Sequence, residues 1–148
     1  MAADLLSRRA WTRTELSTRL RRRGAPPDVA AEVVADLTAR GYLDDARFAR
    51  QWVETRSARG YGPARLAAEL RARGVAVALV RAALASREPS AELERAREAA
   101  RRRLPSLRRV QADRAAARLR DHLLRRGFET ALATRVVREL LGVAQADA

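Results

Sequence analysis

The sequence predicts an all-α protein of three tandem three-helix repeats that form an elongated, curved array. Three observations support this prediction. Alanine, leucine and arginine, which favour helices, dominate the chain, and isoleucine is absent. Glycines with the features of helix ends recur at Gly24, Gly74 and Gly127, 50 and 53 residues apart. The apolar residues around each glycine keep the same spacing, which is typical of repeats that stack on their neighbours in line.

The spacing is the same in all three copies. Leucines stand eight and four residues before each glycine, an arginine stands directly before it, and a valine or leucine follows at five and ten residues. In the first copy these are Leu16, Leu20, Arg23, Val29 and Val34. Amphipathic helices in such a chain could match by chance, but the shared Arg-Gly stop favours a true repeat. We expect repeats over residues 1–41, 42–87 and 88–148.

The first repeat has clear helix signals. A short helix is expected over residues 4–9. Thr12 and Glu15 have the spacing of a capping box, and the helix they open ends at Gly24. Proline at a helix start opens the next helix. Its expected apolar stripe consists of Val29, Val33, Val34 and Leu37.

The second and third repeats are delimited in the same way. Asp44 is an expected N-cap, with Asp45 in the first turn, where negative charge suits the helix dipole. A break at 60–63 precedes a helix that ends at Gly74, and a short helix is expected over 77–86. Ser90 is an expected cap for a helix over 91–103, which the Pro105 break ends. Two further helices are expected over 111–126 and 129–141.

The net charge is +13, and all the Lys and Arg residues counted in it are arginines. Residues 1–24 hold seven arginines against two acids, and residues 95–126 hold twelve against three, whereas residues 25–94 are balanced at ten against ten. A small protein this basic is attracted to polyanions, above all nucleic acid, or to an acidic protein surface.

Several function classes find no support in the sequence. Without cysteine, neither a disulfide framework nor a cysteine metal site can form. No apolar run reaches bilayer length and no secretory leader is recognisable, so we expect a soluble, cytoplasmic protein that is not membrane-bound. Asp44 and Asp45 could form a catalytic or metal-binding pair. Adjacent residues at a helix start point in different directions, however, so we interpret both as helix-capping residues. The only histidine, His122, has no nucleophile partner and is expected at the surface or at its boundary. We expect no enzyme activity, cofactor or metal.

One segment resembles the RecX family of bacterial recombinase regulators. Its motif runs Tyr-Leu-Asp-Asp-x-Arg-Phe-Ala, followed by a Gly-x-Gly turn, Leu-x-x-Glu-Leu and a closing glycine. The resemblance extends upstream to Thr14-Glu15-Leu16 and downstream to residues 123–128. The residues that we assign to the family motif are Tyr42, Leu43, Asp44, Asp45, Arg47, Phe48, Ala49, Gly60, Gly62, Leu66, Leu70 and Gly74.

The resemblance implies an all-helical protein of three three-helix repeats that binds the RecA recombinase. Such proteins lie in the groove of the RecA filament on DNA and inhibit its ATPase and strand exchange, and they can also bind DNA. We therefore expect as partners the RecA filament and single- or double-stranded DNA without sequence preference, and we expect a monomer.

Arginines are the candidate contact residues, because arginine can bind phosphate or carboxylate with two parallel hydrogen bonds. Most of the 31 are expected on solvated helix faces. The candidates for RecA or DNA binding are Arg21, Arg22, Arg23, Arg56, Arg59, Arg65, Arg71, Arg73, Arg101, Arg102, Arg103, Arg108, Arg109, Arg125 and Arg126. Tyr61 and Trp11 are possible stacking groups, although packing is the favoured interpretation.

Two other functions remain open from the sequence. A helix-turn-helix transcription regulator would also be basic and helical, but should strongly prefer one duplex site. A helical adaptor, whose arginines serve solubility alone, should not bind DNA even at low salt. A filament modulator should bind DNA weakly and with strong salt dependence.

Overall fold

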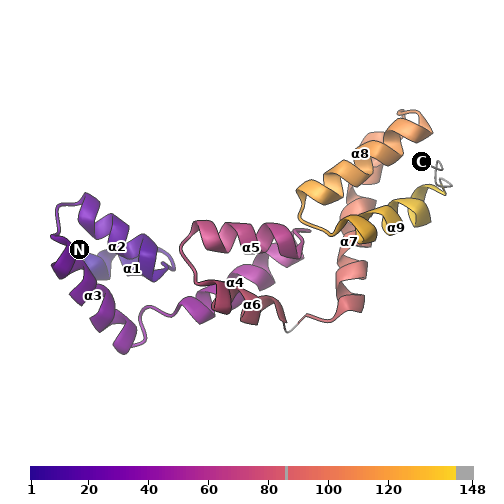
Figure 1. Ribbon diagram of the computed structural model, residues 1–148. Coiled ribbons are helices and arrows are strands. Elements are labelled where there is room, and N and C mark those ends of the chain that lie inside the picture. The colour runs from indigo at the N-terminus through magenta and orange to yellow at the C-terminus, as the bar shows by residue number, and fades with distance from the viewer. Residues whose placement is uncertain (86, 143–148) are drawn as a thin grey trace. The chain divides into compact units, whose positions relative to one another are not determined.

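The computed structural model describes residues 1–85 and 87–142, which form nine α-helices and a 3-10 helix and contain no β-strand (Figure 1). The predicted all-α class is confirmed. In chain order the helices are α1 Ala2–Arg8, α2 Arg13–Arg22, α3 Pro27–Ala39, α4 Asp45–Ala58, α5 Pro63–Ala72, α6 Val77–Ala85, α7 Pro89–Arg103, η1 Leu104–Leu107, α8 Ala112–Arg125 and α9 Thr130–Leu141.

The chain divides into two compact units. Unit 1 consists of residues 1–53 and 68–85, and unit 2 of residues 54–67 with the described residues from 87 onward. Helices α4 and α5 each contribute residues to both units. The repeat boundaries 1–41, 42–87 and 88–148 remain a prediction.

The first three helices enclose a core of aliphatic side chains within unit 1. Leu5, Leu16, Leu20, Val34 and Leu43 are buried in it. The capping box that opens α2 is present as predicted. The Glu15 backbone N–H donates to Thr12 Oγ1 at 3.1 Å, and the Thr12 N–H donates to Glu15 Oε1 at 3.1 Å.

One part of the predicted apolar pattern is wrong by one residue. Val29, expected in the stripe of α3, is 42% exposed, whereas Ala30 is fully buried. The same shift occurs in the other copies, where Val80 and Ala133, six residues after their glycines, are buried. Consecutive helical residues point about 100° apart, so the residue at six, not at five, shares the face that ends at Val34.

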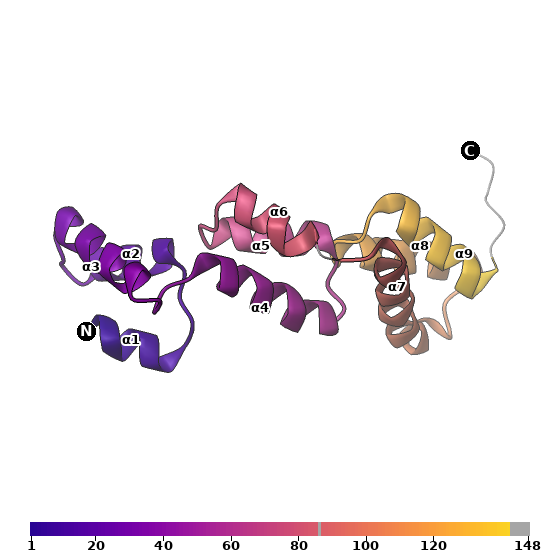
Figure 2. The ribbon, with the colours of Figure 1, turned by 90° about the horizontal axis from the view of Figure 1, so that it is seen from below.

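Helices α7, α8 and α9 pack against one another in unit 2 (Figures 1 and 2). Their core includes Leu119, Leu123 and Val136, while α7 contributes mainly small side chains: Ala96, Ala99 and Ala100. The cap predicted at Ser90 is wrong. Helix α7 begins at Pro89, its N-cap is Glu88, and that residue makes no side-chain cap bond. A proline at the first position needs no partner for an N–H, which explains the earlier start.

The three repeat glycines end their helices in the same way. Their φ angles are +98°, +86° and +95° at Gly24, Gly74 and Gly127, a left-handed conformation that other residues rarely adopt. The N–H of the residue after each glycine then donates to the carbonyl of the leucine four residues before that glycine. These bonds are Ala25 to Leu20 at 3.0 Å, Val75 to Leu70 at 3.0 Å and Phe128 to Leu123 at 3.1 Å. This is the Schellman type of helix ending.

In unit 1 the end of α5 lies against the start of α2. Thr12 Oγ1 donates to the Arg73 carbonyl at 2.7 Å, and Thr14 Oγ1 donates to the Gly74 carbonyl at 3.4 Å. A side chain at position 74 would collide with Thr14. We call this contact the α5–α2 joint.

In unit 2 the end of α8 meets the start of α5 in a related way. The Gly62 N–H donates to the Arg126 carbonyl at 2.6 Å, and the Ala64 N–H donates to the Gly127 carbonyl at 3.1 Å. Neither Gly62 nor Gly127 has room for a Cβ, because each would press on the other's segment. We call this contact the α8–α5 joint. It pairs the free carbonyls of one helix end with free amides of another helix start, which also brings opposite ends of the two helix dipoles together.

The acidic pair of the family motif caps two different helices. Asp44 Oδ1 accepts from the Arg47 N–H at 3.0 Å, so the predicted N-cap of α4 is confirmed. Asp45 Oδ1 accepts from the Arg13 N–H at 3.0 Å, at the first residue of α2. Each carboxylate therefore accepts from an N–H in the first turn of a helix, α4 for Asp44 and α2 for Asp45. Such an N–H has no acceptor within its own helix.

The α8–α5 joint makes a stability prediction. Gly127→Ala should destabilise the protein more than Gly24→Ala, although both glycines have nearly the same φ. Alanine in this conformation costs about 1–2 kcal/mol at either site. At position 127 the new methyl also strikes the Arg65 backbone, whereas nothing lies within 4 Å at position 24, so a further ~1–3 kcal/mol is expected.

Urea unfolding followed by circular dichroism would compare these two variants with the wild type. Equal losses in the free energy of unfolding would show that the close contact at Gly127 is not formed.

Candidate basic binding surface

Most of the family-motif residues lie in the core or at helix ends. Leu43, Phe48, Ala49, Leu66 and Leu70 are buried, and the glycines at 60, 62 and 74 lie in the helix ends and joints described above. Tyr42 differs, with 64% of its surface exposed. Arg47 Nη2 donates to the Gly41 carbonyl at 3.3 Å, which ties the start of α4 to the preceding turn.

Arg73 is part of the α5–α2 joint. Its Nη1 lies 3.0 Å from Glu15 Oε2, and its guanidinium carbon lies 4.3 Å from the centre of the Trp52 ring. The Glu15 carboxylate also receives Arg9 at 3.6 Å. The half-buried Arg73 side chain therefore holds helix ends together, and a role for it in RecA or DNA binding stays a prediction.

Three further candidates surround one aromatic ring in unit 2. The guanidinium carbons of Arg56, Arg65 and Arg126 lie 4.1, 4.5 and 4.3 Å from the centre of the Tyr61 ring. Arg65 Nη1 also donates to the Arg125 carbonyl at 3.2 Å, and Arg126 Nη1 donates to the Arg59 carbonyl at 3.2 Å. Cation–π contacts of this kind hold each guanidinium in place.

The aromatic rings at positions 61 and 11 are therefore packing groups, as favoured from the sequence. Trp11 Nε1 donates to the Leu5 carbonyl at 2.9 Å, and the Arg9 guanidinium covers its ring at 3.4 Å.

A second group of candidates is exposed, and no side-chain hydrogen bond or ion pair joins its members to the described part of the chain. It includes the last turn of α2, where basic residues also suit the helix dipole. The members are Arg21, Arg22, Arg23, Arg59, Arg71, Arg103, Arg108, Arg109 and Arg125. Their guanidinium groups are open to a partner's phosphate or carboxylate groups.

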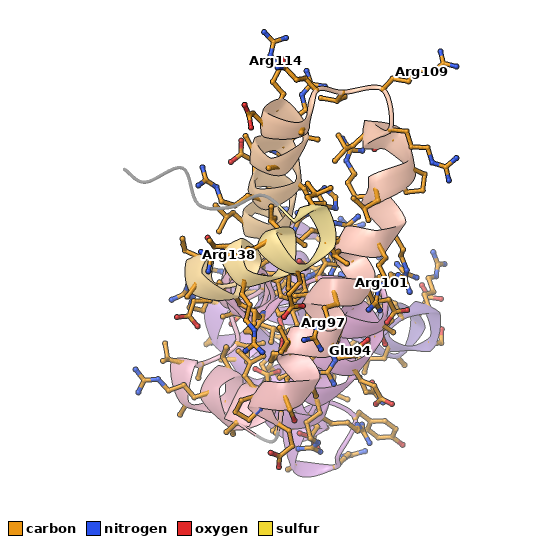
Figure 3. All side chains as sticks on the ribbon, turned by 90° about the vertical axis from the view of Figure 1, so that its right-hand side faces the viewer. Glu94, Arg97, Arg101, Arg109, Arg114 and Arg138 are labelled. Atoms are coloured by element: carbon orange, nitrogen blue, oxygen red, sulfur yellow. The ribbon has the colours of Figure 1, made fainter. Side chains whose placement is uncertain are left out.

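Other arginines of α7 form ion pairs instead. Arg101 Nη1 lies 3.2 Å from Glu94 Oε1, and Arg102 Nη2 lies 2.8 Å from Glu98 Oε1. Arg97, which also contacts Glu94, makes a two-pronged contact with Glu139 of α9 at 2.8 and 3.1 Å. Figure 3 shows Glu94, Arg97 and Arg101 along α7. These hydrogen bonds raise the pKa of Arg97 and lower the pKa of Glu139.

The sequence reasoning missed exposed arginines on α8. Arg114, Arg118 and Arg120 are exposed, and Figure 3 shows Arg114 and Arg109 extending outward near the connection between η1 and α8. Arg114, Arg118 and Arg125 are four and seven residues apart, which places them on one helix face. This helical spacing is the sequence pattern that indicates these arginines, whereas the sequence-based candidates favoured runs of adjacent arginines.

His122 lies half-buried on α8, near several of these cations. Burial lowers its pKa below the ordinary value of 6.5, and the positive charges of Arg126, Arg103 and Arg125 lower it further. The sequence-based placement of His122 at the surface boundary is confirmed. The imidazole is therefore neutral at pH 7 and reports the local positive potential.

Residues 1–85 and 87–142 contain neither a candidate metal site nor a candidate membrane-spanning helix. No cluster of three or more His, Asp or Glu side chains is placed to hold a metal ion. In the same residues, none of the helices has the length and apolar character required to cross a bilayer.

These features define a class: an all-helical repeat protein with exposed arginines at helix ends. Comparison with known proteins identifies the family. Models of the first, second and third three-helix domains of RecX match residues 1–37, 44–84 and 90–137. The chain belongs to the RecX family, as its motif indicated.

Individual relatives agree with this assignment. The regulatory protein RecX of Thermobifida fusca is 44% identical over 138 residues, covering 93% of this chain and 75% of the relative. That of Streptomyces coelicolor is 37% identical over 138 residues, covering 93% and 73%. The crystal structure of RecX from Lactobacillus salivarius superposes with a TM-score of 0.82 at 20% identity, covering 96% of this chain and 93% of that one, and so shares the fold.

The electrostatics at His122 make a pH prediction. The pKa of His122 should lie below 6.5, and Arg103→Gln should move it upward without restoring 6.5, because burial remains. The unfolded chain binds this proton more readily than the folded one. Stability due to neutral His122 is therefore present above pH 6.5 and declines as the pH falls through 6.5 towards the lower folded pKa.

An NMR titration of the single histidine ring would measure this pKa. Arg138→Gln removes the same charge from an exposed site on α9 and should leave the pKa nearly unchanged. A wild-type pKa of 6.5 or above would contradict the described surroundings.

Proposed function

We propose that this chain is a non-catalytic regulator that binds the RecA recombinase filament on DNA and inhibits its ATPase and strand exchange. Membership in the RecX family carries the proposal, because curated relatives of high coverage are named regulatory proteins. The exposed arginines support a binding role. Asp44 and Asp45, the pair that most resembled catalytic groups, cap helices instead.

The proposed mechanism is steric and electrostatic. Arg21, Arg22 and Arg23 form an exposed set at the end of α2, and Arg108 and Arg109 form another after η1. Such guanidinium groups can bind DNA phosphates and carboxylates of the recombinase with paired, charge-assisted hydrogen bonds. Occupying the filament in this way would hinder the changes between neighbouring recombinase subunits that ATP hydrolysis requires.

Binding to DNA alone is proposed to be non-specific, on single or double strands. Affinity should then fall steeply as salt rises, since each phosphate contact releases a counterion. The protein would act as a monomer in the bacterial cytoplasm, where recombinase filaments assemble.

The test is a titration of the cognate recombinase. Substoichiometric amounts of this protein should lower the DNA-dependent ATPase and strand exchange of RecA. Replacing Arg21, Arg22 and Arg23 with glutamine should raise the half-inhibiting concentration roughly tenfold, equivalent to about 1.4 kcal/mol of binding free energy.

The matched control replaces three exposed arginines that each pair with an acid four residues away: Arg8, Arg40 and Arg135. It removes the same charge and should change inhibition little. Unchanged RecA ATPase and strand exchange at saturating protein would refute the proposal. A large preference for one duplex sequence would favour a helix-turn-helix transcription regulator instead.

A further inference from the structure

The α8–α5 joint gathers positive charge around a rigid centre. Arg126 is the C-cap of α8, and its carbonyl and that of Gly127 accept from the start of α5. Its guanidinium contacts Tyr61 at 4.3 Å. Arg125 precedes it, and Arg103 ends α7 close enough to act on His122 together with both. We call Arg103, Arg125 and Arg126 the joint cluster.

The central member of the cluster is held in position and has donors to spare. Arg126 uses Nη1 to donate to the Arg59 carbonyl at 3.2 Å and stacks on Tyr61. A guanidinium has five N–H groups, and the hydrogen bond to Arg59 uses one of them. Because the side chain is already ordered, a ligand loses less conformational entropy when it binds there.

The positive charge of the cluster is not balanced locally. Among the described residues, no carboxylate is paired with Arg103, Arg125 or Arg126 in a salt bridge, whereas the two arginines directly before Arg103, Arg101 and Arg102, pair with Glu94 and Glu98. The neutral state of the nearby imidazole is consistent with this excess of positive charge. An anion placed here would therefore find a positive potential and free donors.

We infer that the joint cluster is a phosphate site for the backbone of nucleic acid, bound across the ends of α7 and α8. This inference rests on the proposed function and assigns its DNA contact to a particular place. A single carboxylate or phosphodiester carries one negative charge and cannot balance three guanidinium groups, whereas a nucleic-acid backbone continues to further phosphates at a regular spacing and can present several of them to the cluster. The backbone carbonyls of Arg126 and Gly127 link this site to the joint, so an occupied site stabilises the α8–α5 contact.

The test uses the full chain and a short single-stranded oligonucleotide, without recombinase. The oligonucleotide should raise the pKa of His122, because phosphate offsets the arginine charges. Arg103→Gln should weaken oligonucleotide binding and reduce the slope of log affinity against log salt by about one phosphate contact. The exposed Arg103 side chain makes no hydrogen bond or ion pair with the described residues, so this variant should fold normally. Arg138→Gln is the charge-matched control and should leave slope and His122 response nearly unchanged.

Three outcomes would decide the matter. Oligonucleotide binding without any change at His122, and with equal slopes for both variants, would overturn the inference and leave the proposed function standing. An equal His122 response to polyglutamate at the same charge concentration would overturn the phosphate assignment in favour of carboxylate. A phosphate response at His122 together with unaffected RecA ATPase would support the site and refute the proposed function.

Discussion

The structure depends on one interaction, the meeting of a glycine-ended helix with the start of a helix from another repeat. A helix end leaves carbonyls without partners, and a helix start leaves amides without partners. In the α8–α5 joint these groups satisfy each other directly, and in the α5–α2 joint threonine hydroxyls do so. The left-handed glycine exposes the carbonyls, and the lack of a side chain permits the approach. Buried leucines four and eight residues before each glycine anchor the preceding helix in the core.

This arrangement sorts the arginines into two roles. Arg73, Arg65 and Arg126 lie at the joints, where their guanidinium groups contact aromatic rings or backbone carbonyls. The exposed arginines at the end of α2 and around η1 have no such contacts in the described residues and are available to a partner. Adjacent arginines in one run therefore differ in how they are held: Arg126 contacts the Arg59 carbonyl and the Tyr61 ring, while Arg125 is exposed. The net charge of the chain alone therefore does not distinguish the arginines at the joints from the exposed ones.

Much of the fold could be predicted because it is encoded locally. The capping box at Thr12, the N-cap at Asp44 and the glycine stops act within a few residues of themselves, and the structure contains all of them. Long-range pairings could not be predicted. Nothing near Asp45 indicates that it caps Arg13, and nothing near Tyr61 indicates that Arg126 covers it. The error at Val29 has a different cause: apolar character favoured valine, whereas the phase of the helix turns Ala30, and not Val29, towards the core. The candidate arginines could be named from the sequence, but their separation into packed and exposed groups required the tertiary structure.

Amide hydrogen exchange at the start of α5 tests the central interaction most directly. First-turn amides have no acceptor in their own helix, so they exchange quickly unless another segment supplies one. The joint predicts that the Gly62 and Ala64 amides exchange slowly, like amides in the helix interior. The Ala131 amide in the first turn of α9, whose N-cap side chain makes no hydrogen bond, provides the fast reference. If Gly62 and Ala64 exchange as fast as Ala131, the α8–α5 joint does not form, and the repeats are held together in some other way.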